Sequence, residues 1–158
     1  MRLKIITKGI NLSLVFSFLT VVAVSVQGQV DTAELKKLQG TWKMVSAEVD
    51  GKKVKDDLVK QAMITYSGDK VILFTPHQHK DTIYARITKL DSSKEPGEMQ
   101  WVRSDGPNAG KTMISIYKFD GPDQCHVCFD PAMTTVPKKF GTDPGSGLIW
   151  HTWKRVKN

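Results

Sequence analysis

Apolar and polar residues alternate along most of the chain after residue 40, and alternation with a period of two predicts β-strands. In residues 82–90, Ile83 and Ile87 share one face while Arg86 lies on the other. Residues 99–103 alternate in the same way. Residues 111–119 have apolar side chains on both faces. The chain is therefore predicted to be built mainly of strands, most of them with one buried face.

Eight segments have strand-like content: residues 41–49, 63–66, 70–75, 82–90, 99–103, 111–119, 125–129 and 148–156. All later connections except residues 130–147 have hairpin length, which favours an antiparallel meander. Closure of such a sheet removes its exposed edges. The predicted fold class is all-β, an eight-stranded antiparallel up-and-down barrel.

Two short helices are predicted near the start of this barrel. Asp31 or Thr32 can cap a helix in which Leu35 and Leu38 share a face, and Gly40 ends it. A second helix begins at residues 56–57, where two carboxylates suit the positive end of the helix dipole. The barrel is thus expected to carry one or two short N-terminal helices.

Residues 1–28 have the pattern of a secretory signal peptide. Arg2, Lys4 and Lys8 precede an apolar run over residues 10–24, and Gly28 ends a stretch suited to cleavage. An uncleaved signal anchor is the alternative, although the run is shorter than the ~20 apolar residues that span a bilayer. We predict cleavage after Gly28, a single domain over residues 29–158, and a secreted, periplasmic or cell-envelope location.

Charge gives little support to a polyanionic partner. The whole chain has a net charge of +7, but the predicted signal peptide contains three of the 23 basic residues and none of the 16 acidic ones, which leaves +4. The remaining lysines are spread along the chain, whereas nucleic-acid-binding proteins cluster them on one face. We expect no nucleic-acid partner and no stable membrane insertion after cleavage. The charge still allows weak attraction to acidic glycans or an anionic cell envelope. The sequence does not indicate the oligomeric state.

Short motifs in a fixed order support a family resemblance. They are Leu38-Gln39-Gly40-Thr41-Trp42, Asp50-Gly51, Gly68-Asp69, Leu90-Asp91 with Pro96, Gly110-Lys111, Ile116-Tyr117 with Asp120-Gly121, Val127-Cys128, Pro137 to Phe140, and Lys154-Arg155. From Leu35 to Arg155 the chain resembles the lipocalin-like domain of secreted planctomycete-type bacterial proteins. That family is a binding fold with no agreed activity.

The resemblance has one structural implication and two departures. Gly40, two residues ahead of Trp42, matches the start of the lipocalins, and as in that family the tryptophan on the first strand and the arginine on the last, here Trp42 and Arg155, are expected to pack together. The chain has Val136 where the family usually has arginine, and Cys125 where an aliphatic residue is expected. No role of that arginine can be transferred.

The segment Cys125-His126-Val127-Cys128 suggests either a disulfide or a redox dithiol. On a strand, however, three residues advance about 10 Å and place the two side chains on opposite faces, whereas a disulfide needs Cα atoms within about 7 Å. No helical pattern follows to lower a thiol pKa. We predict two free cysteines and keep a thiol redox protein as the third functional hypothesis.

Metal and catalytic motifs are weak. His77 and His79 are two residues apart, with His126 or His151 as conceivable further ligands, but no nearby acidic or thiol ligand supports zinc. Residues 106–112 resemble a phosphate-binding loop but have one residue too few between the glycines and lead into a strand. No nucleophile elbow or carboxylate pair is recognisable. We expect no metal, no cofactor and no enzymatic activity.

Sulfur and aromatic side chains suggest what the barrel holds. The predicted lining consists of Met99, Trp101, Met113, Tyr117 and Phe129, with residues 91–98 and 104–110 as rim loops. The first functional hypothesis is a carrier or sensor of a small apolar molecule. The second is an extracellular or envelope interaction module with a filled barrel, because side chains alone can fill eight strands.

Overall fold

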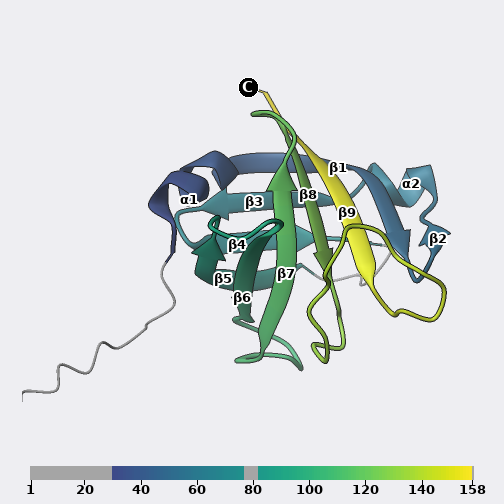
Figure 1. Ribbon diagram of the computed structural model, residues 1–158. Coiled ribbons are helices and arrows are strands. Elements are labelled where there is room, and N and C mark those ends of the chain that lie inside the picture. The colour runs from purple at the N-terminus through teal and green to yellow at the C-terminus, as the bar shows by residue number, and fades with distance from the viewer. Residues whose placement is uncertain (1–29, 77–81, 158) are drawn as a thin grey trace, which may run out of the picture.

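The computed structural model describes residues 30–76 and 82–157. In this part of the chain, two short helices lie among the first four elements and every other element is a strand, as Figure 1 shows. The elements are α1 (Thr32–Leu38), β1 (Gly40–Val49), β2 (Lys52–Lys53), α2 (Asp56–Val59), β3 (Met63–Ser67), β4 (Lys70–Phe74), β5 (Ile83–Asp91), β6 (Gly97–Arg103), β7 (Thr112–Phe119), β8 (Gln124–Phe129) and β9 (Ile149–Arg155). Both predicted helices are present, and α2 is a single turn.

The strands form a closed, antiparallel up-and-down barrel. From β3 to β9 each strand pairs with the next, β1 pairs with β3, and β1 also pairs with β9 from Trp42↔Arg155 to Val49↔Ile149. The two-residue strand β2 pairs only with the end of β1, outside the ring. The predicted eight-stranded barrel is confirmed, and the sequence prediction missed only β2.

The barrel has two different ends. The closed end carries α1 and the turns β3–β4, β5–β6 and β7–β8; the open end carries the loops β6–β7 and β8–β9 (Figure 1). At the closed end the Asp31 side chain caps α1, accepting from the backbone N–H groups of Ala33 at 2.9 Å and Glu34 at 3.2 Å. Gly40 then turns the chain into β1 with φ +98°, which residues other than glycine adopt only with strain.

The closed half of the barrel is filled by side chains. Leu38, Trp42 and Met99 are each at most 1 % exposed there. The rings of Trp42 and Phe119 lie 6.3 Å apart, and the Tyr117 ring packs edge-on to Phe119 at 5.9 Å. The filled part of the core therefore lies at the end covered by α1, and the core continues into the open half as the wall of the barrel. In the described residues, no helix combines the length and the apolar character needed to cross a membrane.

Candidate functional site

A cavity of about 390 Å³ occupies the open half of the barrel. Its apolar wall consists of Val49, Leu73, Ile83, Ala85, Trp101, Met113, Phe129, Pro131, Met133 and Ile149, and its polar residues are Arg103, Asn108 and Lys111. The volume falls within the range of about 300 to 1,000 Å³ that is usual for small-molecule sites. The open half of the barrel therefore has room for a ligand.

Strand pairing explains why these residues meet. Trp101 on β6 lies opposite Met113 on β7, and Phe129 on β8 lies opposite Ile149 on β9. Inward-facing positions alternate along each strand, and these four side chains all face the same cavity. On β5 the inward-facing Ala85 lies opposite Arg103 of β6, and its small side chain leaves space that a larger residue would fill.

The start of the β8–β9 connection is fixed at the cavity mouth by Asp130, which is 5 % exposed. Its carboxylate accepts hydrogen bonds from the backbone of Ala132 at 2.8 Å and from the backbone and hydroxyl groups of Thr134 and Thr135 at 2.7 to 3.1 Å. Burial opposes ionisation, but these donors outweigh it and lower the pKa of Asp130 to about 2. The clamp holds Met133, with φ +59°, at the mouth.

The polar part of the mouth is cationic. Arg103 ends β6, and its Nε lies 3.5 Å from the Asp105 carboxylate, too poorly aligned for a hydrogen bond. Lys111 precedes β7 and donates from Nζ to the Asn108 amide oxygen at 3.1 Å. The described lining contains no acidic residue. Sequence reasoning missed both cations, although each stands two residues from a predicted lining residue and hence on the same strand face.

Three of the five predicted lining residues, Trp101, Met113 and Phe129, lie in the cavity wall. Met99 and Tyr117 are buried at 0 % and 2 % exposure but do not line it. The Tyr117 ring lies over Gly97, its partner on β6, where a Cβ would come within 2.8 Å of the ring. Its hydroxyl donates to Glu34 at 3.2 Å. These two residues therefore belong to the filled half.

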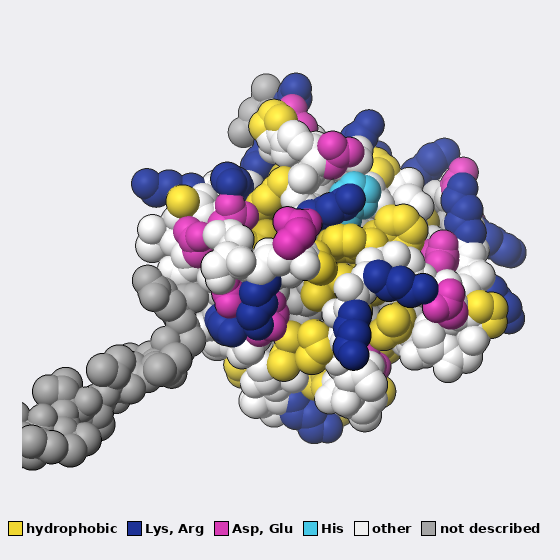
Figure 2. Space-filling model, viewed as in Figure 1, with side chains coloured by type: hydrophobic (Ala, Val, Ile, Leu, Met, Phe, Trp, Pro, Cys, Tyr) yellow, Lys and Arg dark blue, Asp and Glu magenta, His cyan; other side chains and the backbone are white. Residues whose placement is uncertain are grey.

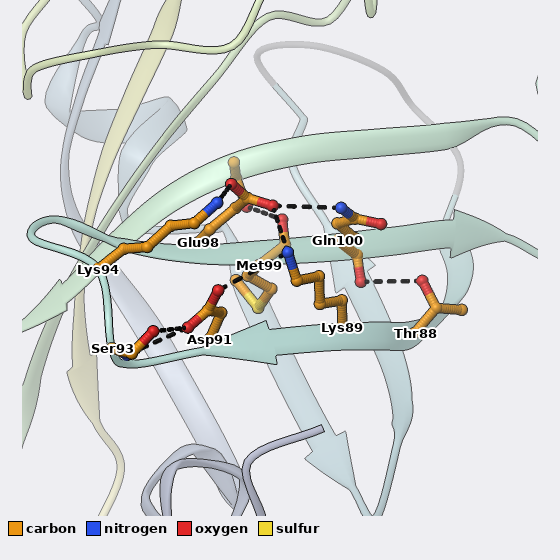
Figure 3. A network of polar contacts seen from close by, with 9 residues as sticks. Thr88, Lys89, Asp91, Ser93, Lys94, Glu98, Met99 and Gln100 are labelled. Carbon is orange, nitrogen blue, oxygen red and sulfur yellow. Dashed lines mark hydrogen bonds and ion pairs between the residues drawn. The ribbon is translucent and has the colours of Figure 1, made fainter. Parts of the chain in front are cut away.

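The expectation that residues 91–98 and 104–110 share a rim is wrong. Residues 104–110 lie at the open end, but residues 91–98 lie at the closed end, where the Ser92 hydroxyl donates to Asp31 at 2.5 Å. Consecutive turns of an up-and-down barrel alternate between its ends, and these two turns are consecutive. Figure 3 shows how polar side chains fix this hairpin: Lys89 and Lys94 both pair with Glu98.

Gly40, Trp42 and Arg155 meet at the closed end. The Arg155 guanidinium lies 4.1 Å from the Trp42 ring centroid, so the predicted stacking is present. The same guanidinium donates to the carbonyls of Gln39 and Lys37, which end α1. The Trp42 Nε1 donates to the Leu38 carbonyl at 2.6 Å. This group fixes the helix across the barrel end, away from the cavity.

Cys125 and Cys128 are both buried and are not bridged, as predicted. Cys125 faces the core and Cys128 the outer side of β8, under the β8–β9 connection, where its thiol lies 3.8 Å from the Gly141 carbonyl. Burial raises the pKa of Cys125 to about 12, with the Glu34 carboxylate adding to it, and burial raises that of Cys128 to about 11. Neither thiol has the lowered pKa of a redox dithiol.

The histidines do not form a metal site in the described part of the chain. His77 and His79 lie outside the described residues. His126 contacts Phe140 on the outer side of β8, whereas His151 faces the core between Phe129 and Trp153. Figure 2 shows the face formed by β7 to β9, where hydrophobic side chains lie among lysines and arginines. No group of three or more metal-ligating side chains occurs among the described residues.

No protein-family model matches the chain, and neither the curated proteins nor the solved structures include a significant match. The fold indicates a structural class, which is broader than a protein family. An eight-stranded, all-antiparallel closed barrel is consistent with a calycin-like fold. Membership of the planctomycete-type family stays a prediction from the sequence motifs.

Proposed function

We propose that this protein binds a small, largely apolar molecule in the open half of its barrel and acts as a carrier or sensor outside the cytoplasm. The observation that carries the proposal is the cavity of about 390 Å³, with ten apolar residues in its wall and three polar ones at its mouth. An apolar cavity of this size exceeds the space needed for one or two waters. The external location rests on the predicted signal peptide.

Binding is favoured over catalysis by the residue types in the site. The described lining contains no Ser, Cys, His, Asp or Glu, the side chains that most often act as nucleophiles or general bases. The side-chain polar groups of the described lining are those of Arg103, Asn108 and Lys111, together with the Trp101 indole. Such a lining can orient a ligand without transforming it.

The proposal is tested with a neutral apolar fluorophore, N-phenyl-1-naphthylamine, titrated into protein expressed from the full coding sequence. We expect saturable binding to the wild type. In Ala85→Phe the added ring occupies the cavity, so affinity should fall at least about tenfold, the effect of ~1.4 kcal/mol. Circular dichroism and thermal unfolding should show that the variant is folded.

The matched control is Ala33→Phe, which introduces the same side chain at an exposed position of α1, at the closed end. This variant should bind the fluorophore as the wild type does. If the wild type shows no saturable binding, or if Ala85→Phe binds as tightly as Ala33→Phe, the cavity is not a ligand site.

The second candidate is an interaction module that works through its outer surface. It is supported by Ile72 and Tyr84, paired across β4 and β5, and by Met63 on β3, which are 45 %, 49 % and 44 % exposed. Its premise of a filled barrel does not hold for the open half. If Ile72→Ser/Tyr84→Ser abolished a pull-down interaction that Ala85→Phe leaves intact, this candidate would be preferred.

A further inference from the structure

We propose that the ligand is a medium-chain amphiphile whose anionic head group is bound by Arg103 and Lys111 while its apolar chain lies in the cavity. This inference rests on the proposed function, because it names the chemical class of the molecule that the cavity holds. It assigns the two cations at the mouth a role in specificity.

The strand register separates an apolar level from a cationic level. Trp101 and Met113 are paired across β6 and β7. Arg103 follows Trp101 by two residues and Lys111 precedes Met113 by two, so both cations lie on the inner face, one step closer to the mouth. The backbone N–H of Arg103 donates to the Lys111 carbonyl at 3.3 Å, which places the two residues opposite each other.

Two like charges opposite each other on a strand pair destabilise the pair. Asp105 compensates in part, since it lies 3.5 Å from Arg103, but it also accepts from the backbone of Tyr84 at 3.3 Å. Lys111 donates to a neutral amide, that of Asn108. Two cations and one carboxylate give this mouth a net charge of +1, which favours an anionic head group.

Unused hydrogen-bond donors point in the same direction. The Nε of Arg103 and the indole Nε1 of Trp101 are buried and have no hydrogen-bond partner among the described residues. Buried donors in native proteins are normally paired, with protein, water or ligand. Trp101 is 5 % exposed and lines the cavity. An oxyanion accepts several hydrogen bonds at once, and guanidinium is the side chain best suited to donate them.

The volume limits the chain length. If a methylene group needs roughly the ~30 Å³ that one water takes up in the liquid, a cavity of about 390 Å³ holds on the order of a dozen heavy atoms. A saturated chain of about ten carbons with one head group meets this limit. Decanoate and decyl phosphate share this chemistry and stand for a fatty acid and a phosphorylated lipid, and decanol is the uncharged counterpart.

The test is displacement of N-phenyl-1-naphthylamine by these three compounds at pH 7.5 and low salt. We expect decanoate or decyl phosphate to bind at least about tenfold more tightly than decanol, the effect of one charge-assisted hydrogen bond. The tighter of the two anions identifies the head group. In Arg103→Gln/Lys111→Gln this preference should disappear, while decanol still binds.

The matched control is Lys43→Gln/Lys154→Gln, which removes two lysines that are paired across β1 and β9 on the outer wall and are exposed. It changes the net charge equally and should keep the preference. Salt gives a measurement independent of any variant: 1 M NaCl should strongly reduce the preference of the wild type by screening. Equal binding of decanol and both anions, or a preference that survives in Arg103→Gln/Lys111→Gln, would overturn the proposal and leave apolar binding standing. Failure of all three compounds and of the fluorophore would overturn both.

Discussion

Arg155 lies at the end of the last strand, where most substitutions have small effects, but replacing it should destabilise the protein strongly. Its guanidinium stacks on Trp42 at 4.1 Å and donates to the Gln39 and Lys37 carbonyls at the end of α1. It also donates to the Pro122 carbonyl at 3.3 Å. Arg155→Ala would remove the stacking and leave two helix-end carbonyls without this donor.

The expected magnitude follows from these contacts. The stacking contributes ~0.5–2 kcal/mol and each carbonyl hydrogen bond ~1 kcal/mol. Because the side chain is 25 % exposed, values in the lower half of these ranges apply. We expect Arg155→Ala to lower the free energy of unfolding by about 2–3 kcal/mol. Arg155→Lys keeps the charge but loses the planar fork, and should cost about 1–2 kcal/mol.

Urea unfolding followed by tryptophan fluorescence and thermal unfolding followed by circular dichroism measure these differences. The melting temperature of Arg155→Ala should fall by roughly 10 °C for a domain of this size. Lys154→Ala, an exposed neighbour on β9, is the control and should change stability by less than about 0.5 kcal/mol. If the melting temperatures of Arg155→Lys and Arg155→Ala both equal that of the wild type, the contacts of Arg155 at the closed end do not stabilise the fold.

Three further predictions concern other parts of the barrel. Because the pKa of Asp130 is lowered from 3.8 to about 2, its ionised form stabilises the protein above about pH 4 and this contribution is lost as pH falls to 2. Asp130→Asn should therefore lower stability at pH 7 by about 1–2 kcal/mol, with the urea midpoints converging near pH 2, and a constant gap would contradict this. Alkylation of the unfolded, unreduced protein should label both Cys125 and Cys128, whereas a mass corresponding to no free thiol would show a bridge. Gly97→Ala places a Cβ 2.8 Å from the Tyr117 ring and should lower stability by ~1–3 kcal/mol in thermal unfolding; an unchanged melting temperature would mean that the ring moves aside.

The strand order and both cysteine positions were predictable because they depend on local rules. A period of two is visible in a single strand, and the same period places Cys125 and Cys128 on opposite faces of β8. Hairpin-length links then leave few alternatives to a meander. The position of residues 91–98 at the closed end was also implied by the meander, since turns alternate between ends, but the sequence reasoning did not use that consequence.

The cavity itself depends on residues that no local pattern connects. Its size reflects a small side chain, Ala85 on β5, facing the space between larger ones on other strands. Asp130 and Met133 come from a long connection without any periodicity, and their place at the mouth is set by hydrogen bonds formed only in the folded chain. At the closed end the Tyr117 hydroxyl donates to Glu34 on α1, a partner far away in sequence that no local pattern indicates.

The pairing of β1 with β9 has a consequence for how the protein folds. Every other strand of the ring pairs with a neighbour in sequence order, but this pair joins the two ends of the domain. A chain still lacking β9 has two unpaired strand edges, on β1 and β8, and such edges favour aggregation. Contacts between sequence-distant strands also slow folding. Ring closure must therefore wait until β9 is available, and until then the other strands can form only an open sheet with two unpaired edges.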